Sequence, residues 1–238
     1  MSFLINQQQL EFKRIPAPVQ LIHYNPTHYC LHLFSEQFKI MPPDLLGQWV
    51  LKRQAQFLAG RIAAKNALSS IFVTSENIAI GQHREPLWPK GVFGSISHSG
   101  DVSIATAQCQ SDVTEATIGI GLDIQAVFDQ EEQAKLLTII LSQHDQILFE
   151  KVKSSLPENH FLTLIFSAKE SYFKAVFSQV EEYFDFDEVS IESIDLQNNQ
   201  LTLVNANSTI NPEIMLVIHY EFLILGNNKS SVITYCSR

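Results

Sequence analysis

The chain has few cysteines, and their positions do not suit a disulfide framework. Only Cys30, Cys109 and Cys236 occur among its 238 residues, and no two of them form a C-x-x-C pair. An odd number without such a pair argues against a set of disulfides and against a cysteine zinc site. A reducing compartment, the cytosol, is therefore expected.

Long apolar runs are also missing from the sequence. None reaches the ~18 residues that a membrane helix needs. The N-terminal segment turns to glutamines at Gln7 before the apolar core of a signal peptide develops. We therefore expect a cytoplasmic protein without a membrane span.

Positive charge is not in excess either. The net charge is −9, so the chain has no general field that would attract nucleic acid or anionic lipid. Eight histidines are scattered and include no His-Glu-x-x-His pair, which disfavours a zinc hydrolase. What the chain does have is 45% hydrophobic residues, enough to build one large core or two smaller ones.

Prolines and apolar periodicity divide the first half of the chain. Pro42-Pro43-Asp44 predicts the start of a helix that continues to about Ser69. The expected apolar stripe of this helix is Leu51, Ala55, Leu58 and Ile62. Residues 84–89 contain two prolines and predict a loop, and residues 92–97 and 102–108 predict a hairpin around the turn at 98–101.

The second half repeats the order of helix followed by strands. Residues 117–124 predict a strand, residues 131–153 and 161–177 predict helices, and further strands are expected near Val189, Leu201, Met215 and Val232. Because helices and strands are grouped and do not alternate strictly, we expect an α+β fold with two similar halves, residues 1–117 and 118–238.

Two segments carry ionisable groups that packing alone does not explain. Asp123 interrupts an apolar strand, where a buried carboxylate without a partner would cost several kcal/mol. Glu170 and Lys174 lie one turn apart on a helix, which taken alone is most simply an ordinary surface pair worth about 0.3 to 0.5 kcal/mol. Together with the polar turn at His98, the two acids suit a site for a hard cation such as Mg²⁺.

Three segments, in this order, resemble the signature motifs of the surfactin-type 4′-phosphopantetheinyl transferase family. They are Ser95-Ile96-Ser97-His98-Ser99, Gly121-Leu122-Asp123-Ile124-Gln125 and Phe166-Ser167-Ala168-Lys169-Glu170-Ser171-Tyr172-Phe173-Lys174-Ala175. The enterobactin synthase component D branch is also similar at Phe57-Leu58-Ala59-Gly60-Arg61 and Arg84-Glu85-Pro86-Leu87-Trp88-Pro89. The resemblance covers roughly residues 54–175; each motif is weak alone, and all of them in order are specific.

The resemblance implies a fold and an activity. The implied fold is a pseudo-dimer of two α+β halves with the active site between them. The implied activity is Mg²⁺-dependent transfer of the phosphopantetheine arm of coenzyme A, the substrate, to a serine of an apo carrier protein or carrier domain, releasing 3′,5′-ADP. We expect a monomer that serves siderophore or other non-ribosomal peptide or polyketide synthesis.

The resemblance also implies roles for individual residues. Asp123, Gln125 and Glu170 match the metal ligands, and Glu170 is expected to act as general base beside Lys174 and Asp123. The residues expected to bind coenzyme A are Arg61, Lys65, Arg84, Ser97, His98, Lys169 and Lys174. Gln125 departs from the family pattern, in which many members have an acid there; its amide oxygen can accept a metal or a water but supplies no charge. A non-metal role for Gln125 is an equal alternative.

Two other functions are alternatives to the transferase activity that the resemblance implies. A non-catalytic carrier-protein or nucleotide-binding module would retain the fold with a decayed metal site at Gln125, although the retention of Asp123, Glu170 and Lys174 argues against it. A transferase that serves fatty-acid synthesis differs only in the carrier protein, and the sequence does not separate the two.

Overall fold

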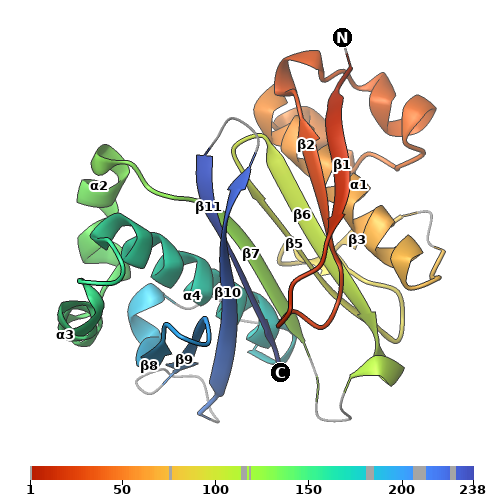
Figure 1. Ribbon diagram of the computed structural model, residues 1–238. Helices are drawn as coiled ribbons and strands as arrows, with labels where there is room; N and C mark the ends of the chain where they lie inside the picture. Colours follow the sequence, from red (N-terminus) through yellow and green to blue (C-terminus); the bar gives the residue numbers. More distant parts are fainter. Residues whose placement is uncertain are drawn as a thin grey trace. The chain divides into compact units, whose positions relative to one another are not determined.

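The computed structural model describes residues 2–74, 77–113, 117, 119–180, 185–205, 213–225 and 229–238. The chain divides into two compact units, Met1–Thr117 and Ile118–Arg238. Each unit contains an antiparallel sheet and a long helix that packs against it (Figure 1). The expected α+β class is confirmed, whereas the pseudo-dimer relation between the halves stays a prediction.

The first unit is a four-stranded antiparallel sheet in the order β1-β2-β6-β5. Its strands are β1 (Leu4–Leu10), β2 (Val19–Tyr24), β5 (Val92–Ser99) and β6 (Val102–Cys109). A small ladder joins β3 (Ala79–Ile80) to β4 (Pro86–Leu87). Four short helical turns connect these elements: η1 (Pro26–His28), η2 (Leu33–Gln37), η3 (Asp44–Gln48) and η4 (Gln110–Asp112).

Helix α1 (Leu51–Ser70) packs against the central strands β2 and β6 of this sheet. Four alanines at successive steps of four are completely buried on it: Ala55, Ala59, Ala63 and Ala67. Residues four apart share one face of a helix, and side chains of one carbon let the helix lie close to the sheet. The helix contains four basic residues and no acidic one, so all of its charged positions are cationic.

The second unit is a five-stranded antiparallel sheet in the order β7-β11-β10-β9-β8. Its strands are β7 (Ile120–Ala126), β8 (Ser190–Asp195), β9 (Gln200–Val204), β10 (Met215–Leu225) and β11 (Lys229–Ser237). Helix α4 (Glu158–Val180) packs on β7, β11 and β10, with α2 (Gln130–Ile140), α3 (Gln143–Val152) and the turn η5 (Phe186–Glu188) around it.

The predicted helix from Asp44 is wrong at its start. A 3₁₀ turn, η3, ends at Gln48, and Trp49 and Val50 are extended before α1 begins. The ring of Trp49 lies 5.3 Å from that of Phe57, whereas eight residues of continuous helix would separate them by about 12 Å. The aromatic contact therefore requires the break, and Leu51, expected in the apolar stripe, is 68% exposed.

The predicted helix over 131–153 is two helices. Leu141 is extended, and Ser142 begins α3 with a capping box shared with Asp145. A serine that accepts from the backbone N–H three residues on offers the chain an alternative to continued helix.

Strands β1 and β2 were not predicted, because the glutamine run in β1 leaves it largely exposed and without alternation. The other predicted strands and the hairpin are present, but residues 84–89, expected as a loop, contain strand β4, and His98 and Ser99, expected in the turn, belong to β5. None of the helices in the described ranges is long and apolar enough to cross a membrane.

Candidate functional site

Helix α4 lies directly on strand β7 at two glycines. A Cβ atom at Gly121 would lie 1.8 Å from the carbonyl oxygen of Ser171, and one at Gly119 would lie 2.0 Å from that of Ala175. Alternate residues of a strand share one face, so Asp123 continues the face on which these glycines meet the helix. Only glycine permits this approach, which brings the Asp123 strand against the helix that carries Glu170 and Lys174.

Asp123 is buried, with 4% of its surface exposed. Its Oδ1 accepts a hydrogen bond from Lys174 Nζ at 2.7 Å, and its Oδ2 accepts one from Ser167 Oγ, also at 2.7 Å. Lys174 Nζ also donates to the carbonyl oxygen of Leu122 at 3.1 Å. A buried carboxylate needs such partners, because without them desolvation would neutralise it. The partners expected for Asp123 are thus Lys174 and Ser167, both on α4.

Glu170 lies one turn before Lys174 and is half-buried. Burial raises the pKa of the Glu170 carboxyl above its ordinary value, the positive charge of Lys174 opposes this shift, and the negative charge of Asp123 adds to it. The two acids and the lysine therefore act on one another electrostatically, as one cluster. Two ionised carboxylates beside one ammonium leave a net negative charge, which attracts a divalent cation.

Gln125 follows Asp123 on the same face of β7 and is half-buried. Its Nε2 donates to the carbonyl oxygen of Ala126 at 3.1 Å, so this bond uses the nitrogen of the amide and not its oxygen. Within the described residues, no group of three or more His, Cys, Asp or Glu side chains gathers at a possible metal site. The set of donors still fits Mg²⁺, which usually takes one or two protein carboxylates and completes its shell with water and phosphate oxygens.

Lys169, although next to Glu170 in the chain, has a different environment. Its side chain is 1% exposed and forms an ion pair with Asp145 at 3.1 Å. Its Nζ also donates to the carbonyl oxygens of Ile140 and Phe186, each at 2.9 Å. Successive helix residues point about 100° apart, and this rotation turns Lys169 into the core. All three of its protons have acceptors within the second unit, so these contacts give no support to the expected role of Lys169 in binding coenzyme A, which stays a prediction.

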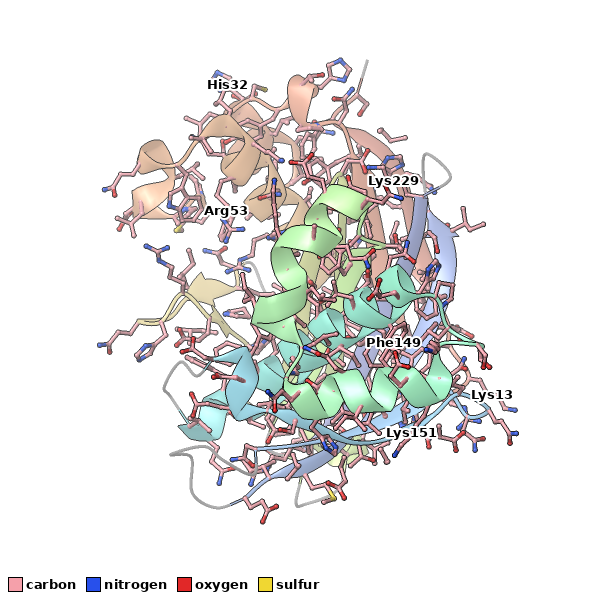
Figure 2. The ribbon with its side chains drawn as sticks, turned by 90° about the vertical axis from the view of Figure 1, so that its left-hand side faces the viewer. Lys13, His32, Arg53, Phe149, Lys151 and Lys229 are labelled. Carbon is pink, nitrogen blue, oxygen red and sulfur yellow. The ribbon has the colours of Figure 1, made fainter. Side chains whose placement is uncertain are left out.

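The first unit holds a second cluster of cations. Arg53, on the first turn of α1 (labelled in Figure 2), lies with Nη1 2.8 Å from His98 Nε2 on β5. Arg61, two turns further along α1, is 7% exposed and packs over the ring of Phe57 at 4.4 Å. Burial and the nearby charge of Arg53 lower the pKa of Arg61 to about 10. Two guanidinium groups that disfavour each other's charge would be stabilised by an anion between or beside them.

Arg53 was not among the expected site residues, although its helix carries four bases and no acid. That imbalance is the signal that could have identified it. Ser97, next to His98 on β5, is 6% exposed. Two other expected residues do not join this cluster through a described contact: Lys65 Nζ donates to the carbonyl oxygen of Phe38 at 3.0 Å, and Arg84 is exposed in the turn between β3 and β4.

Comparison with known proteins gives the same family for both units. Residues 42–108 match the family described as the 4′-phosphopantetheinyl transferase N-terminal domain, and residues 119–236 match the 4′-phosphopantetheinyl transferase superfamily. Enterobactin synthase component D of Salmonella typhi is 34% identical over 79% of this chain and 74% of its own length. The protein of the same name from Escherichia coli O157:H7 is 30% identical over 92% of each chain. The 4′-phosphopantetheinyl transferase Svp of Streptomyces mobaraensis is 27% identical over 60% of this chain and 55% of its own length.

Proposed function

The chain belongs to the 4′-phosphopantetheinyl transferase superfamily, and from this we propose that it moves the phosphopantetheine arm of coenzyme A to a serine of an apo carrier protein. The observation that carries the proposal is the cluster in which Lys174 contacts the buried Asp123, with Glu170 coupled to both. A non-catalytic binding module would have no need to keep two acids desolvated beside one lysine.

The residues of the cluster fit an Mg²⁺ ion. Asp123 and Glu170 would hold it, with the amide oxygen of Gln125 or a water in a further position. When bound, Mg²⁺ supplies positive charge against the oxygens of the coenzyme A pyrophosphate.

Glu170 is the proposed general base. In the reaction the serine oxygen forms a bond to the β-phosphorus, and the bond from that phosphorus to the oxygen bridging to the α-phosphorus breaks, so that 3′,5′-ADP leaves. The serine proton passes to the Glu170 carboxylate, and the half-buried position of Glu170 allows the proton to reach solvent.

The cations have separate proposed roles. The Lys174 ammonium, about a quarter exposed beside Asp123, would interact with the pyrophosphate as its negative charge shifts to the leaving group. In the first unit, Arg53, Arg61 and His98 would bind a phosphate group of coenzyme A, because guanidinium groups match phosphate oxygens in geometry and charge.

The pathway served is the finer part of the proposal. Relatives that are 30% and 34% identical carry the name enterobactin synthase component D. On this basis we propose a carrier domain of siderophore or other non-ribosomal peptide synthesis as the acceptor, in preference to a fatty-acid carrier.

The test is one set of incubations read by intact mass. The protein is mixed with coenzyme A, Mg²⁺ and a panel of apo carriers that includes siderophore-synthase and fatty-acid carriers. We expect a phosphopantetheine-sized mass gain on a siderophore-type carrier that disappears with a chelator. A mass gain on no carrier would contradict the transferase function, and a gain on the fatty-acid carrier alone would contradict the pathway.

Glu170→Gln tests the base in the same assay. General bases contribute about 10²- to 10⁴-fold, so we expect a loss of at least ~100-fold with the fold retained. Glu150→Gln on the exposed surface of α3 is the matched control and should transfer at the wild-type rate. Turnover near wild type in Glu170→Gln would end the assignment.

A further inference from the structure

Three buried hydroxyl groups are connected to Asp123 through hydrogen bonds. Ser167 and Ser171 are one turn apart on α4, Thr234 is on β11, and all three residues are 0% exposed. Thr234 is the cross-strand neighbour of Asp123 in the β7–β11 register. One residue of β11 therefore lies opposite the acid of β7 and also reaches the helix that carries Glu170.

The hydrogen bonds of these groups form a connected set that ends at Asp123. An ionised Asp123 only accepts, so Ser167 Oγ donates its single proton to Oδ2. Thr234 Oγ1 lies 2.9 Å from Ser167 Oγ and 2.8 Å from the carbonyl oxygen of Ser167, and its single proton goes to one of these two acceptors. Ser171 Oγ lies 2.6 Å from Thr234 Oγ1 and 3.1 Å from Thr234 O, and again Ser171 supplies the proton.

This chain of hydroxyl groups has a consequence for Asp123. Hydrogen bonds in a dry interior polarise one another, and when Thr234 donates to Ser167 Oγ each proton points toward the carboxylate. Oδ2 is held by Ser167 and Oδ1 by Lys174, so both oxygens are tethered to α4. Without the Thr234 hydroxyl, Ser167 would lose a polar contact that holds it beside Asp123.

We propose that Thr234 and Ser167 are positioning residues that hold the Asp123 carboxylate in one orientation for the divalent cation. The inference rests on the proposed function for the presence of that cation. Thr234 belongs to none of the three sequence motifs and acts through Ser167, whereas Ser167 acts through Asp123 directly. Partners that orient a metal ligand typically change metal affinity by 10- to 100-fold when they are removed.

The test measures Mn²⁺ binding to the free protein by electron paramagnetic resonance, without coenzyme A or carrier. Thr234→Val keeps the shape of the side chain and removes the hydroxyl, and Thr234→Ser restores it. We expect Thr234→Val and Ser167→Ala to bind Mn²⁺ about 10-fold more weakly, Thr234→Ser to bind as the wild type does, and Asp123→Asn to lose most binding. In the transfer assay, KM for coenzyme A at saturating Mg²⁺ should stay unchanged.

Two outcomes would overturn the inference. One is a folded Thr234→Val protein that binds Mn²⁺ like the wild type while melting at a lower temperature, which would assign the hydroxyl groups to core stability alone. The other is Thr234→Ser binding as weakly as Thr234→Val. If Thr234→Val does not fold, Ser167→Ala decides by the same measurement. Because Mn²⁺ binding needs no carrier, a wild-type protein that transfers nothing would count against the proposed function and not against this inference.

Discussion

At the scale of single residues, the burial and the partners of a charged side chain depend on the side of α4 from which it projects. Lys169 and Glu170 are neighbours in the chain, yet the lysine has three acceptors in the core and the glutamate is half-exposed beside Asp123 and Lys174. The two acids of the site are stabilised differently. The buried Asp123 accepts hydrogen bonds from two side chains, whereas the half-buried Glu170 is stabilised chiefly by the positive charge of Lys174. The stability of the protein should therefore respond to Glu170 in a way that depends on pH.

Glu170→Gln should stabilise the metal-free protein at neutral pH. Since the folded pKa of Glu170 is raised above its ordinary 4.5, the stability that its carboxyl contributes is complete below the ordinary pKa and is lost as pH rises through the folded pKa. Glutamine carries no charge at any pH. The gain in free energy of unfolding should be full above the folded pKa and vanish in acid, as measured by urea unfolding across a pH series in chelator. A gain that is the same at every pH would contradict the raised pKa.

Arg53→Ala should weaken the binding of coenzyme A through one phosphate. A charged hydrogen bond is worth about 1.5 to 3 kcal/mol, so we expect KM for coenzyme A to rise roughly 10- to 100-fold. Coenzyme A lacking its 3′-phosphate should show little difference between variant and wild type if this is the group bound. The control is Lys52→Ala, a neighbouring exposed cation of α1. If Arg53→Ala raises KM equally for coenzyme A and for coenzyme A without its 3′-phosphate, Arg53 contacts another part of coenzyme A.

At the scale of elements, the contact of α4 with β7 determines the arrangement of the site. Two glycines remove the side chains that would otherwise separate helix and strand. The consequence is that the acids on the two elements are spaced by backbone contact, which is more rigid than contact through flexible side chains.

Gly121→Ala should destabilise the protein because its methyl group would meet a backbone carbonyl that cannot rotate away. Overpacking of this kind costs about 1 to 3 kcal/mol, occasionally more. Gly47→Ala is the control, since a Cβ there has no atom within 4 Å, and we expect a change within about 0.5 kcal/mol. Urea unfolding of both variants measures the difference. A Gly121→Ala protein as stable as Gly47→Ala would show that the two elements can separate without cost.

The sequence was sufficient for the periodic elements and for the need of Asp123 for a partner. Long amphipathic stretches predicted α1 and α4, and the isolated Asp123 in an apolar strand indicated a partnered carboxylate. The breaks at Trp49–Val50 and Leu141–Ser142 were not predicted, because they depend on a ring contact and a side-chain cap that compete with helix. The role of Lys169 depends on the tertiary neighbours that it meets, and no local pattern contains that information, whereas the excess of bases on α1 was a local signal for Arg53.

At the scale of the whole molecule, the negative charge is unevenly distributed along the chain. Residues 1–117 have nine Lys and Arg against eight Asp and Glu, whereas residues 118–238 have seven against seventeen. The first unit, which is nearly neutral, contains the cationic helix α1. The second unit, which is acidic, contains the proposed metal ligands. An anionic ligand should need both its cationic contacts and a metal ion to overcome the net charge of −9.

Coenzyme A and Mg²⁺ together should raise the melting temperature more than the sum of either alone. A ligand at 100 times its dissociation constant stabilises a folded protein by about 2.7 kcal/mol, which corresponds to roughly 5 °C or more for a chain of this size. Differential scanning fluorimetry with each ligand, both, and both plus chelator measures the coupling. Additive shifts would mean that the two ligands bind independently.

The bare backbone contact at Gly119 and Gly121 also bears on how such a protein can evolve. Because peptide groups, and not side chains, space the two acid-bearing elements, substitutions in the surrounding core can accumulate without altering that spacing. A single added methyl group at either glycine would alter it at once. Stability and the spacing of the two acid-bearing elements are thus inseparable at these two positions.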